Sequence, residues 1–171
     1  MDAVITIGRP VSLADLDEVR ALMRAFVAWH RELHVEDAHL IDEYFDGEAF
    51  EAELAALPGK YARPEGDLLL ARYDGEAAGC VALRRLDERA CEMKRMFLYP
   101  RFHGLGIGRA LGEAILQEAK TSGYRIMRLD TSVRQSEAQG LYHKLGFRQI
   151  GAYYDVPRPL REWLVFMERD L

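Results

Sequence analysis

The sequence contains little cysteine, no excess of positive charge and no long apolar run. Its 171 residues include only two cysteines, Cys80 and Cys91. Lys and Arg total 23 against 28 Asp and Glu, which gives a formal net charge of -5. That balance offers no general basic field for a nucleic-acid backbone and suits a small cationic partner better. Apolar runs such as residues 68–71 are far shorter than the roughly 20 residues that a helical membrane span needs.

Targeting signals and linkers are also lacking. Asp2 stands where a signal peptide carries a base, and the apolar stretch that follows it is too short for one. We therefore expect a cytoplasmic protein with two reduced cysteines. No repeat, low-complexity stretch or Pro/Gly/Ser-rich linker divides the chain, so residues 1–171 are expected to form a single domain.

Hydrophobic periodicity and turn signals predict a mixed α/β fold. Ser12 followed by Asp15 resembles a capping box at the start of an amphipathic helix, and Asp74-Gly75 is a strong hairpin signal. The expected order is β-α-α-β-β-β-α-β-α-β-β, a central mixed sheet flanked by helices. Strands are expected at residues 4–7, 67–73, 76–86, 90–98, 125–131, 147–155 and 163–169, and helices at 12–33, 46–57, 106–122 and 135–145.

Two strand pairings can be predicted within this order. Strands 90–98 and 125–131 flank a helix, so this β-α-β unit should place them parallel to each other. Strands 76–86 and 90–98 follow each other through a tight turn. That register places Cys91 opposite a residue near Arg84 and Cys80 opposite one near Arg95, so the two thiols are not expected to pair.

The most informative segment is a glycine-rich turn between strand 90–98 and the helix that follows. Gly104, Gly106 and Gly108 occupy alternate positions there. Glycine lets the backbone approach a ligand closely, and a helix start presents unpaired N–H groups with a positive dipole end. Together these features predict an anion cradle suited to a pyrophosphate.

Two common phosphate loops do not fit this turn. The Walker loop needs Lys-Ser/Thr after its last glycine, whereas Arg109-Ala110 follows here. The dinucleotide fingerprint G-x-G-x-x-G also fails, because Arg109 stands three residues after Gly106.

Two motifs instead resemble the GNAT-type N-acetyltransferases. Residues 103–108, His-Gly-Leu-Gly-Ile-Gly, resemble motif A, (Gln/Arg)-x-x-Gly-x-(Gly/Ala), with His103 at the position of the usual Gln or Arg. Residues 141–147, Leu-Tyr-His-Lys-Leu-Gly-Phe, resemble motif B, L-Y-x-K-x-G-F, and residues 91–98 resemble the family's fourth strand. The similarity covers residues 67–150, and the element order extends it over the chain.

The resemblance implies an acyltransferase that uses acetyl-CoA as co-substrate. The acceptor would be a primary amine of a small molecule or peptide, attacking directly in a ternary complex. A non-catalytic CoA-binding or acetyl-CoA-binding sensor or interaction module on the same fold is the alternative. The residues that the resemblance places at the coenzyme are Phe97, Leu98, His103, Gly104, Leu105, Gly106, Ile107, Gly108, Arg109, Gln135 and Lys144.

The resemblance also implies catalytic residues. Tyr142 matches the position of a frequent general acid, and Glu92 matches the strand position from which some members supply a general base. Each has a structural alternative: a core aromatic residue for Tyr142 and a carboxylate paired with Lys94 for Glu92. Tyr153, Tyr154 and Asp155 are further groups that could face the acceptor.

The region between the first two helices is expected to cover the acceptor. His30 and His34 share a helix face there, but no H-E-x-x-H motif is present and no metal is expected. The stretch 30–50 carries seven acidic residues that would attract a cationic amine or form a solvated surface. Relatives with this fold often dimerise through their C-terminal strands, so residues 163–170 could support a homodimer.

Overall fold

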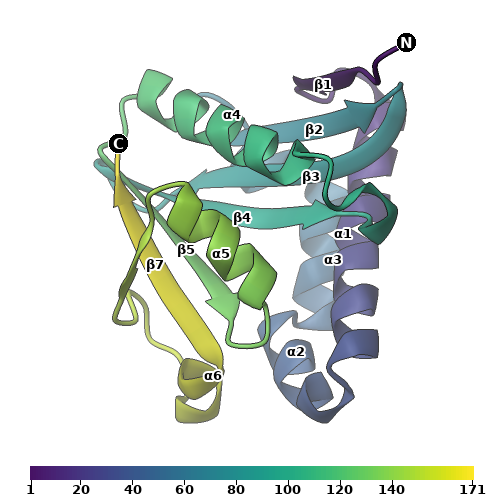
Figure 1. Cartoon of the computed structure of the whole chain (residues 1–171). Coiled ribbons are helices and arrows are strands. Elements are labelled where there is room, and N and C mark those ends of the chain that lie inside the picture. Colours follow the sequence, from purple (N-terminus) through teal and green to yellow (C-terminus); the bar gives the residue numbers. More distant parts are fainter.

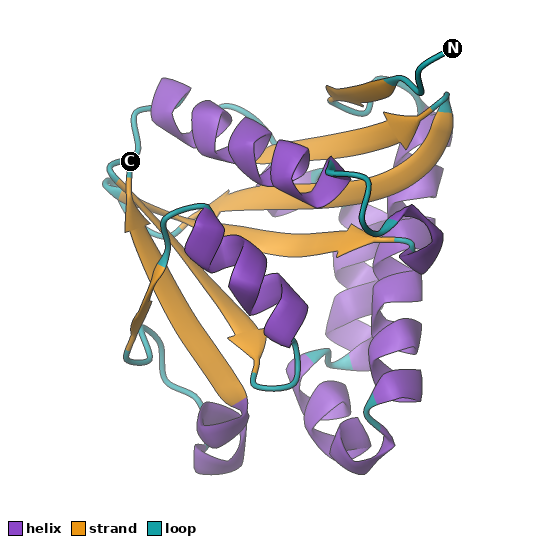
Figure 2. Cartoon of the chain, viewed as in Figure 1, coloured by secondary structure: helices purple, strands orange, loops and turns teal.

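A seven-stranded mixed sheet forms the centre of the computed structural model, which describes residues 1–171 (Figures 1 and 2). Its strand order is β1-β2-β3-β4-β5-β7-β6, antiparallel except for the β4–β5 pair. This confirms the predicted fold class and the parallel pairing. The strands are β1 (Ile5–Gly8), β2 (Asp67–Tyr73), β3 (Glu76–Arg85), β4 (Ala90–Leu98), β5 (Ile126–Ser132), β6 (Arg148–Ile150) and β7 (Leu164–Asp170).

Six α-helices cover the two faces of this sheet (Figure 1). None of them is long and apolar enough to cross a membrane. They are α1 (Leu13–Leu33), α2 (Ala38–Tyr44), α3 (Gly47–Ala56), α4 (Ile107–Thr121), α5 (Ser136–Lys144) and α6 (Arg158–Trp163). Short 3-10 turns lie at Val35–Asp37, Gly59–Tyr61 and Pro100–Phe102.

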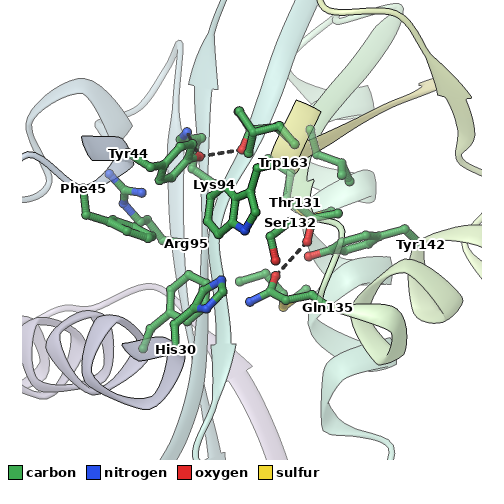
Figure 3. A pocket seen from close by; sticks show the side chains of 16 residues that line it. His30, Tyr44, Phe45, Lys94, Arg95, Thr131, Ser132, Gln135, Tyr142 and Trp163 are labelled. Atoms are coloured by element: carbon green, nitrogen blue, oxygen red, sulfur yellow. Dashed lines mark hydrogen bonds between the residues drawn. The ribbon is translucent and has the colours of Figure 1, made fainter. Parts of the chain in front are cut away.

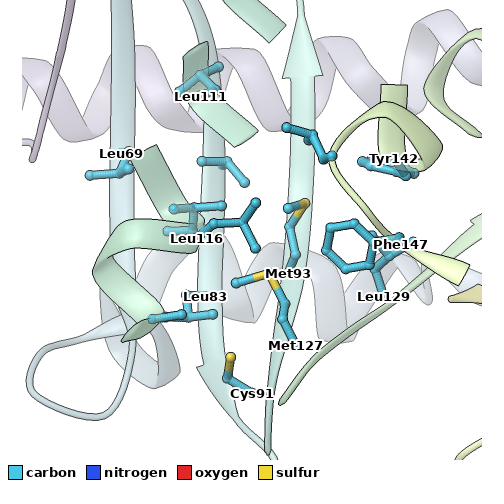
Figure 4. Close-up of a cluster of buried hydrophobic side chains, with 14 of the residues drawn as sticks. Leu69, Leu83, Cys91, Met93, Leu111, Leu116, Met127, Leu129, Tyr142 and Phe147 are labelled. Atoms are coloured by element: carbon cyan, nitrogen blue, oxygen red, sulfur yellow. The ribbon is translucent and has the colours of Figure 1, made fainter. Parts of the chain in front are cut away.

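Alternation along the strands divides the interior into two cores. Successive side chains of a strand point to opposite faces, so Leu69 joins the core beneath α4 and α5 whereas Leu68 and Leu70 join the core beneath α1, α2, α3 and α6. Figure 4 shows the first core, in which Met93 and Met127 pack near Leu111 and Leu116 of α4. The tight packing of α4 depends on Gly112, where an added Cβ would lie 2.4 Å from a Leu145 methyl group.

Local signals set the element boundaries. Ser12 and Asp15 form the predicted capping box at the start of α1, with each side chain accepting a hydrogen bond from the other residue's backbone N–H. Asp46 caps the start of α3, where its side chain accepts hydrogen bonds from two backbone N–H groups of the first turn. Asp74 and Gly75 both have positive φ in the β2–β3 hairpin.

The region after α5 differs from the prediction. The strand expected at 147–155 is only three residues long, and α6 was not expected. Pro157 and Pro159 favour the start of α6, since proline fits the first turn of a helix, where its missing N–H is not needed. The C-terminal strand, β7, pairs with β5 along its whole length and with β6 only at residues 166–168, and the outer strands of the sheet are β1 and β6. A homodimer through residues 163–170 stays a prediction.

A β-bulge and a divergence of strands shape the middle of the sheet. Arg95 has a φ of 57°, and the β3–β4 register shifts there. Cys80 lies opposite Phe97, and its thiol donates to the Arg95 carbonyl oxygen at 3.4 Å, close to the predicted register. Cys91 lies opposite Arg85. The parallel β4–β5 ladder spans only three residue pairs, from Ala90 to Glu92 on β4. Beyond that point the two strands separate (Figure 1).

Candidate active site

A cleft of about 560 Å³ opens where β4 and β5 diverge. The end of β4, the glycine turn, the start of α4 and one side of α5 form its walls, and α1 adds Phe26, Trp29, Leu33 and His34. Of the residues predicted to bind the coenzyme, eight line this cleft: Phe97, Leu98, His103, Gly104, Gly106, Ile107, Gly108 and Gln135.

The glycine turn has the backbone that an anion cradle needs. Gly104 and Gly106 have φ values of 80° and 82°, in the left-handed region that favours glycine. Gly106 is the N-cap of α4, and no side chain caps this helix start. The first backbone N–H groups of α4 therefore remain available beside the cleft. Gly108 packs against Leu141 of α5, where an added Cβ would lie 3.4 Å from a methyl group.

Three of the predicted coenzyme contacts lie outside the cleft. Leu105 is an exposed apolar side chain of the turn. Arg109 forms an exposed ion pair with Glu113 one turn along α4. Lys144 is exposed at the C-terminal end of α5. None of the three lines the cleft, and their coenzyme contacts stay predictions.

His103, which departs from the usual motif A residue, and Gln135 are both held by local contacts. His103 Nε2 lies 3.3 Å from the Leu98 carbonyl oxygen, and its ring meets the edge of Trp29. The Gln135 side chain accepts a hydrogen bond from Thr131 Oγ1 at 2.7 Å. Both residues therefore have fixed positions on the wall of the cleft.

Several cleft residues were not identified from the sequence, and Arg134 is the clearest. Its guanidinium donates to Asp37 at 2.8 Å, and Trp163 Nε1 donates to the same carboxylate at 3.1 Å. The Arg134 hydrogen bond lowers the pKa of Asp37. This contact joins the loop after α1 to the loop after β5. The two residues are 97 positions apart in the sequence, so no local sequence pattern predicts their contact.

A second, smaller cavity lies deeper between the diverging strands. We call this space of about 50 Å³ the inner cavity (Figure 3). It shares Phe26, Met96, Gln135 and Tyr142 with the cleft. Its other lining residues are His30, Tyr44, Phe45, Met93, Lys94, Arg95, Leu129, Asp130, Thr131, Ser132, Trp163 and Leu164.

Tyr142 is the predicted catalytic residue that lies at the junction of the two spaces. It extends from α5, packs its ring against Phe147, and lines both the cleft and the inner cavity. Its side chain is buried, and this burial raises the pKa of the phenol. The hydroxyl makes no hydrogen bond to another protein group, which leaves it free to donate to a ligand.

Glu92 occupies a different environment from Tyr142. It is fully buried, receives a hydrogen bond from Arg84 Nε at 2.6 Å and one from the Tyr153 hydroxyl, and lies 3.9 Å from Lys94 Nζ. It lines neither the cleft nor the inner cavity. Its role as a base stays a prediction, and the ion pair that was its structural alternative is present.

The other polar candidates form a second hydrogen-bonded group. The Tyr154 hydroxyl donates to Asp130 at 2.7 Å, and the Tyr44 hydroxyl donates to the same carboxylate at 2.5 Å. Lys94 Nζ donates to Tyr44 at 2.9 Å. Asp155 is exposed and makes no such contact.

The acidic residues of the stretch 30–50 do not face the inner cavity. Asp37 is paired with Arg134, Asp42 forms an ion pair with Arg31, and Asp46 caps α3. None of the seven lines the cleft or the inner cavity. Their negative charge therefore acts on a cationic ligand only through the general field around the site.

An ion pair behind the bulge supports the inner cavity. The Arg95 guanidinium donates twice to Glu53 of α3, at 2.9 and 3.1 Å, and Lys60 adds a contact of 2.7 Å. Burial alone would raise the pKa of Glu53, but these two cations hold the pKa at about 2 against an ordinary 4.5.

We expect Glu53→Gln to destabilise the fold by about 2–3 kcal/mol at pH 7, because the native state stabilises the Glu53 carboxylate. This stabilisation is fully present above pH 4.5 and is lost as the pH falls towards 2. Urea unfolding at several pH values measures it, with Glu51→Gln as control, since Glu51 pairs with Arg24 on the exposed side of α3. An equal loss at pH 7 and pH 3 would contradict the assignment.

Comparisons with known proteins agree with this arrangement. Residues 31–147 match the model of the acetyltransferase (GNAT) family. An uncharacterized N-acetyltransferase of Schizosaccharomyces pombe is 39% identical over 109 residues, covering 63% of this chain and 67% of the relative. The human N-acetylaspartate synthetase is 35% identical over 113 residues, covering 64% of this chain and 37% of the synthetase. The match thus spans little more than a third of that longer protein.

The fold also matches solved structures over nearly its whole length. The PaiA N-acetyltransferase of Thermoplasma acidophilum, solved in complex with coenzyme A, superposes with a TM-score of 0.72. The two sequences are 21% identical, and the superposition covers 98% of this chain and 99% of that one.

Proposed function

The chain belongs to the acetyltransferase (GNAT) family and is an acyltransferase, and from this premise we propose that it transfers the acetyl group of acetyl-CoA to a primary amine of a small molecule or peptide. The observation that carries this proposal is the continuous path from the glycine turn through the cleft to Tyr142 and the inner cavity. Residues 1–171 would act as one domain, because both cores pack on a single sheet.

The cleft would hold the coenzyme. The start of α4 supplies backbone N–H groups and a positive dipole end to the pyrophosphate, and the left-handed Gly104 and Gly106 let the phosphates approach. The bound coenzyme A of the Thermoplasma relative supports this ligand class. The rest of the coenzyme would extend between the end of β4 and α5.

Chemistry would take place where the cleft meets the inner cavity. Transfer needs a neutral amine, stabilisation of the tetrahedral oxyanion and a proton for the departing thiolate. The β4 backbone near Phe97 and Leu98 lines the cleft at this point and would meet the thioester carbonyl. Tyr142 would donate its proton to the coenzyme sulfur.

Direct attack is favoured over an acyl-enzyme because neither cysteine suits a nucleophile. Burial raises the pKa of Cys80 and that of Cys91 to about 12 each. A thiol of that pKa is almost entirely protonated at neutral pH, and neither cysteine lines the cleft or the inner cavity. The amine would therefore attack the thioester itself.

Release of free CoA thiol in the presence of amines tests this function. We expect wild-type protein to release thiol from acetyl-CoA only when a primary amine is present, with the amine gaining one acetyl group by mass spectrometry. The intact protein incubated with acetyl-CoA alone should keep its mass. An added acetyl group on Cys80 or Cys91 would contradict direct transfer, and the absence of acetylated product from a broad amine panel would contradict the proposed reaction.

A further inference from the structure

The inner cavity contains two polar atoms that lack hydrogen-bond partners. His30 Nδ1 and Ser132 Oγ are both fully buried, and neither has a partner in the protein. Their side chains are 2% and 3% exposed. Buried polar groups are nearly always hydrogen-bonded, so two unpartnered atoms in the lining of one cavity indicate a ligand group that completes them.

These atoms come from opposite walls of the cavity. His30 lies on α1 and Ser132 at the end of β5, and Figure 3 shows the His30 ring reaching towards the side of the cavity that carries Ser132 and Tyr142. A neutral imidazole nitrogen and a hydroxyl oxygen can both accept hydrogen bonds. A ligand with two N–H donors, as in a primary amine, would satisfy both. The space of about 50 Å³ has room for an amino group and the first carbons attached to it.

The other titratable groups in the cavity are already engaged. Asp130 accepts from Tyr44 and Tyr154, while Lys94 and Arg95 are cations that cannot accept a proton. The groups that surround the His30 ring are His34, Asp37, Arg134, Tyr44, Lys94, Arg95, Asp130 and Tyr142. Asp37 is committed to Arg134 and Trp163. Among the titratable groups of the lining, His30 is therefore the proton acceptor that has no hydrogen-bond partner.

We propose that His30 and Ser132 hold the acceptor nitrogen in the inner cavity, and that His30 takes the proton that converts the bound ammonium into the attacking amine. This inference rests on the proposed amine acetylation. It gives the role of base to His30 rather than to the ion-paired Glu92. Burial lowers the pKa of His30 below its usual 6.5, which keeps the imidazole neutral at pH 7.

The proton balance of the step is complete. One proton passes from the ammonium to His30 Nδ1, and His30 later releases it to solvent. The amine nitrogen then attacks the thioester carbon and forms a C–N bond in a tetrahedral adduct. The C–S bond of this adduct breaks, and the C–N bond remains. Tyr142 gives its proton to the thiolate, and the second amine proton, which leaves the nitrogen of the adduct, replaces the proton that Tyr142 lost.

Imidazole resonances of the wild-type protein test the binding part without turnover. Histidine-selective 15N labelling would be followed by titration with methylamine, 2-phenylethylamine and glycinamide in the presence of CoA, which cannot donate an acetyl group. We expect the His30 nitrogen signals to shift with at least one of these amines. The signals of His39, which does not line the inner cavity, should not move. No shift of the His30 signals with any of the three would overturn the proposal.

The pH dependence of turnover tests the proton transfer, with acetyl-CoA and the best of the three amines. Wild-type kcat should fall at acidic pH as His30 becomes protonated. In His30→Gln we expect kcat to drop 10²- to 10⁴-fold at pH 7 with unchanged acetyl-CoA affinity, and the acidic limb to move up to the pKa of the amine itself. The matched control is His39→Gln, because the His39 side chain is exposed and lines neither the cleft nor the inner cavity, so this variant should keep the wild-type kcat and pH profile.

The outcomes separate this proposal from the proposed function. If both His30→Gln and a second variant, His30→Asn, kept the kcat and the pH profile of the wild-type protein, the role of His30 would be overturned. A His30 shift on amine binding without any acetylated product would retain the amine site and contradict the proposed acetylation.

Ser132→Ala should raise KM for the amine several-fold and leave the pH profile of kcat in place, and a shifted profile would contradict its role.

Discussion

Replacing Tyr142 with phenylalanine is expected to lower kcat by about 10²- to 10³-fold, because the thiolate would then leave without a positioned proton donor. The substitution removes a single oxygen from a hydroxyl that makes no hydrogen bond within the protein. The ring packing on Phe147 is retained, so acetyl-CoA affinity and folding stability should stay close to those of wild type. Thiol release under saturating acetyl-CoA measures kcat.

A second tyrosine provides the control for this experiment. Tyr124 donates its hydroxyl to the Glu65 carbonyl at 2.6 Å, outside the cleft and the inner cavity, so Tyr124→Phe should leave kcat unchanged. The raised pKa of Tyr142 also means that the phenol stays protonated at pH values up to 10 and imposes no alkaline limb on kcat there. A Tyr142→Phe variant with wild-type kcat would show that another group protonates the thiolate.

Valine at position 106 is expected to weaken acetyl-CoA binding at least tenfold. Gly106 has a φ of 82° and begins α4, and a β-branched residue is strained in that conformation. The helix start would shift, and the N–H groups that face the cleft would lose their alignment with the pyrophosphate. Calorimetric titration of the variant with acetyl-CoA measures the loss.

Strain alone must be separated from loss of the anion site in this test. Gly123 has a φ of 91° beyond the other end of α4, far along the helix from the cleft, so Gly123→Val introduces similar backbone strain. We expect the two variants to lose similar stability, about 1–2 kcal/mol each, and only Gly106→Val to lose affinity. Equal affinities in the two variants would contradict the role of the glycine turn.

Most of the fold could be predicted because its signals are local. The capping box at Ser12 and the Asp74-Gly75 hairpin each involve residues close in sequence, and the structure confirms both. The early end of β6 at Ile150 and the helix α6 were not predicted from the sequence. The Arg95 bulge was not predicted, and the Arg95 side chain pairs with Glu53 of α3, 42 residues earlier in the chain.

In the candidate site, too, the residues in local motifs were predicted and those placed by tertiary contacts were not. The glycine turn and Tyr142 belong to contiguous motifs, and both line the cleft. His30 was considered only as a metal ligand, because its orientation towards Ser132 depends on how α1 packs over β3 and β4. The seven acidic residues were expected either to attract a cationic amine or to form a solvated surface. Contacts with Arg134 and Arg31 and the cap of α3 hold Asp37, Asp42 and Asp46 away from the cavity. Tertiary contacts of this kind leave no trace in sequence spacing.

Calorimetric titration of the wild-type protein with acetyl-CoA tests the central claim most directly. The account predicts saturable binding with a micromolar Kd and one site per chain, since the cleft joins the uncapped start of α4 to Tyr142. Coenzyme A should compete for the same site. Absence of binding at millimolar acetyl-CoA would contradict the assignment of the cleft to the coenzyme, and with it the proposed reaction.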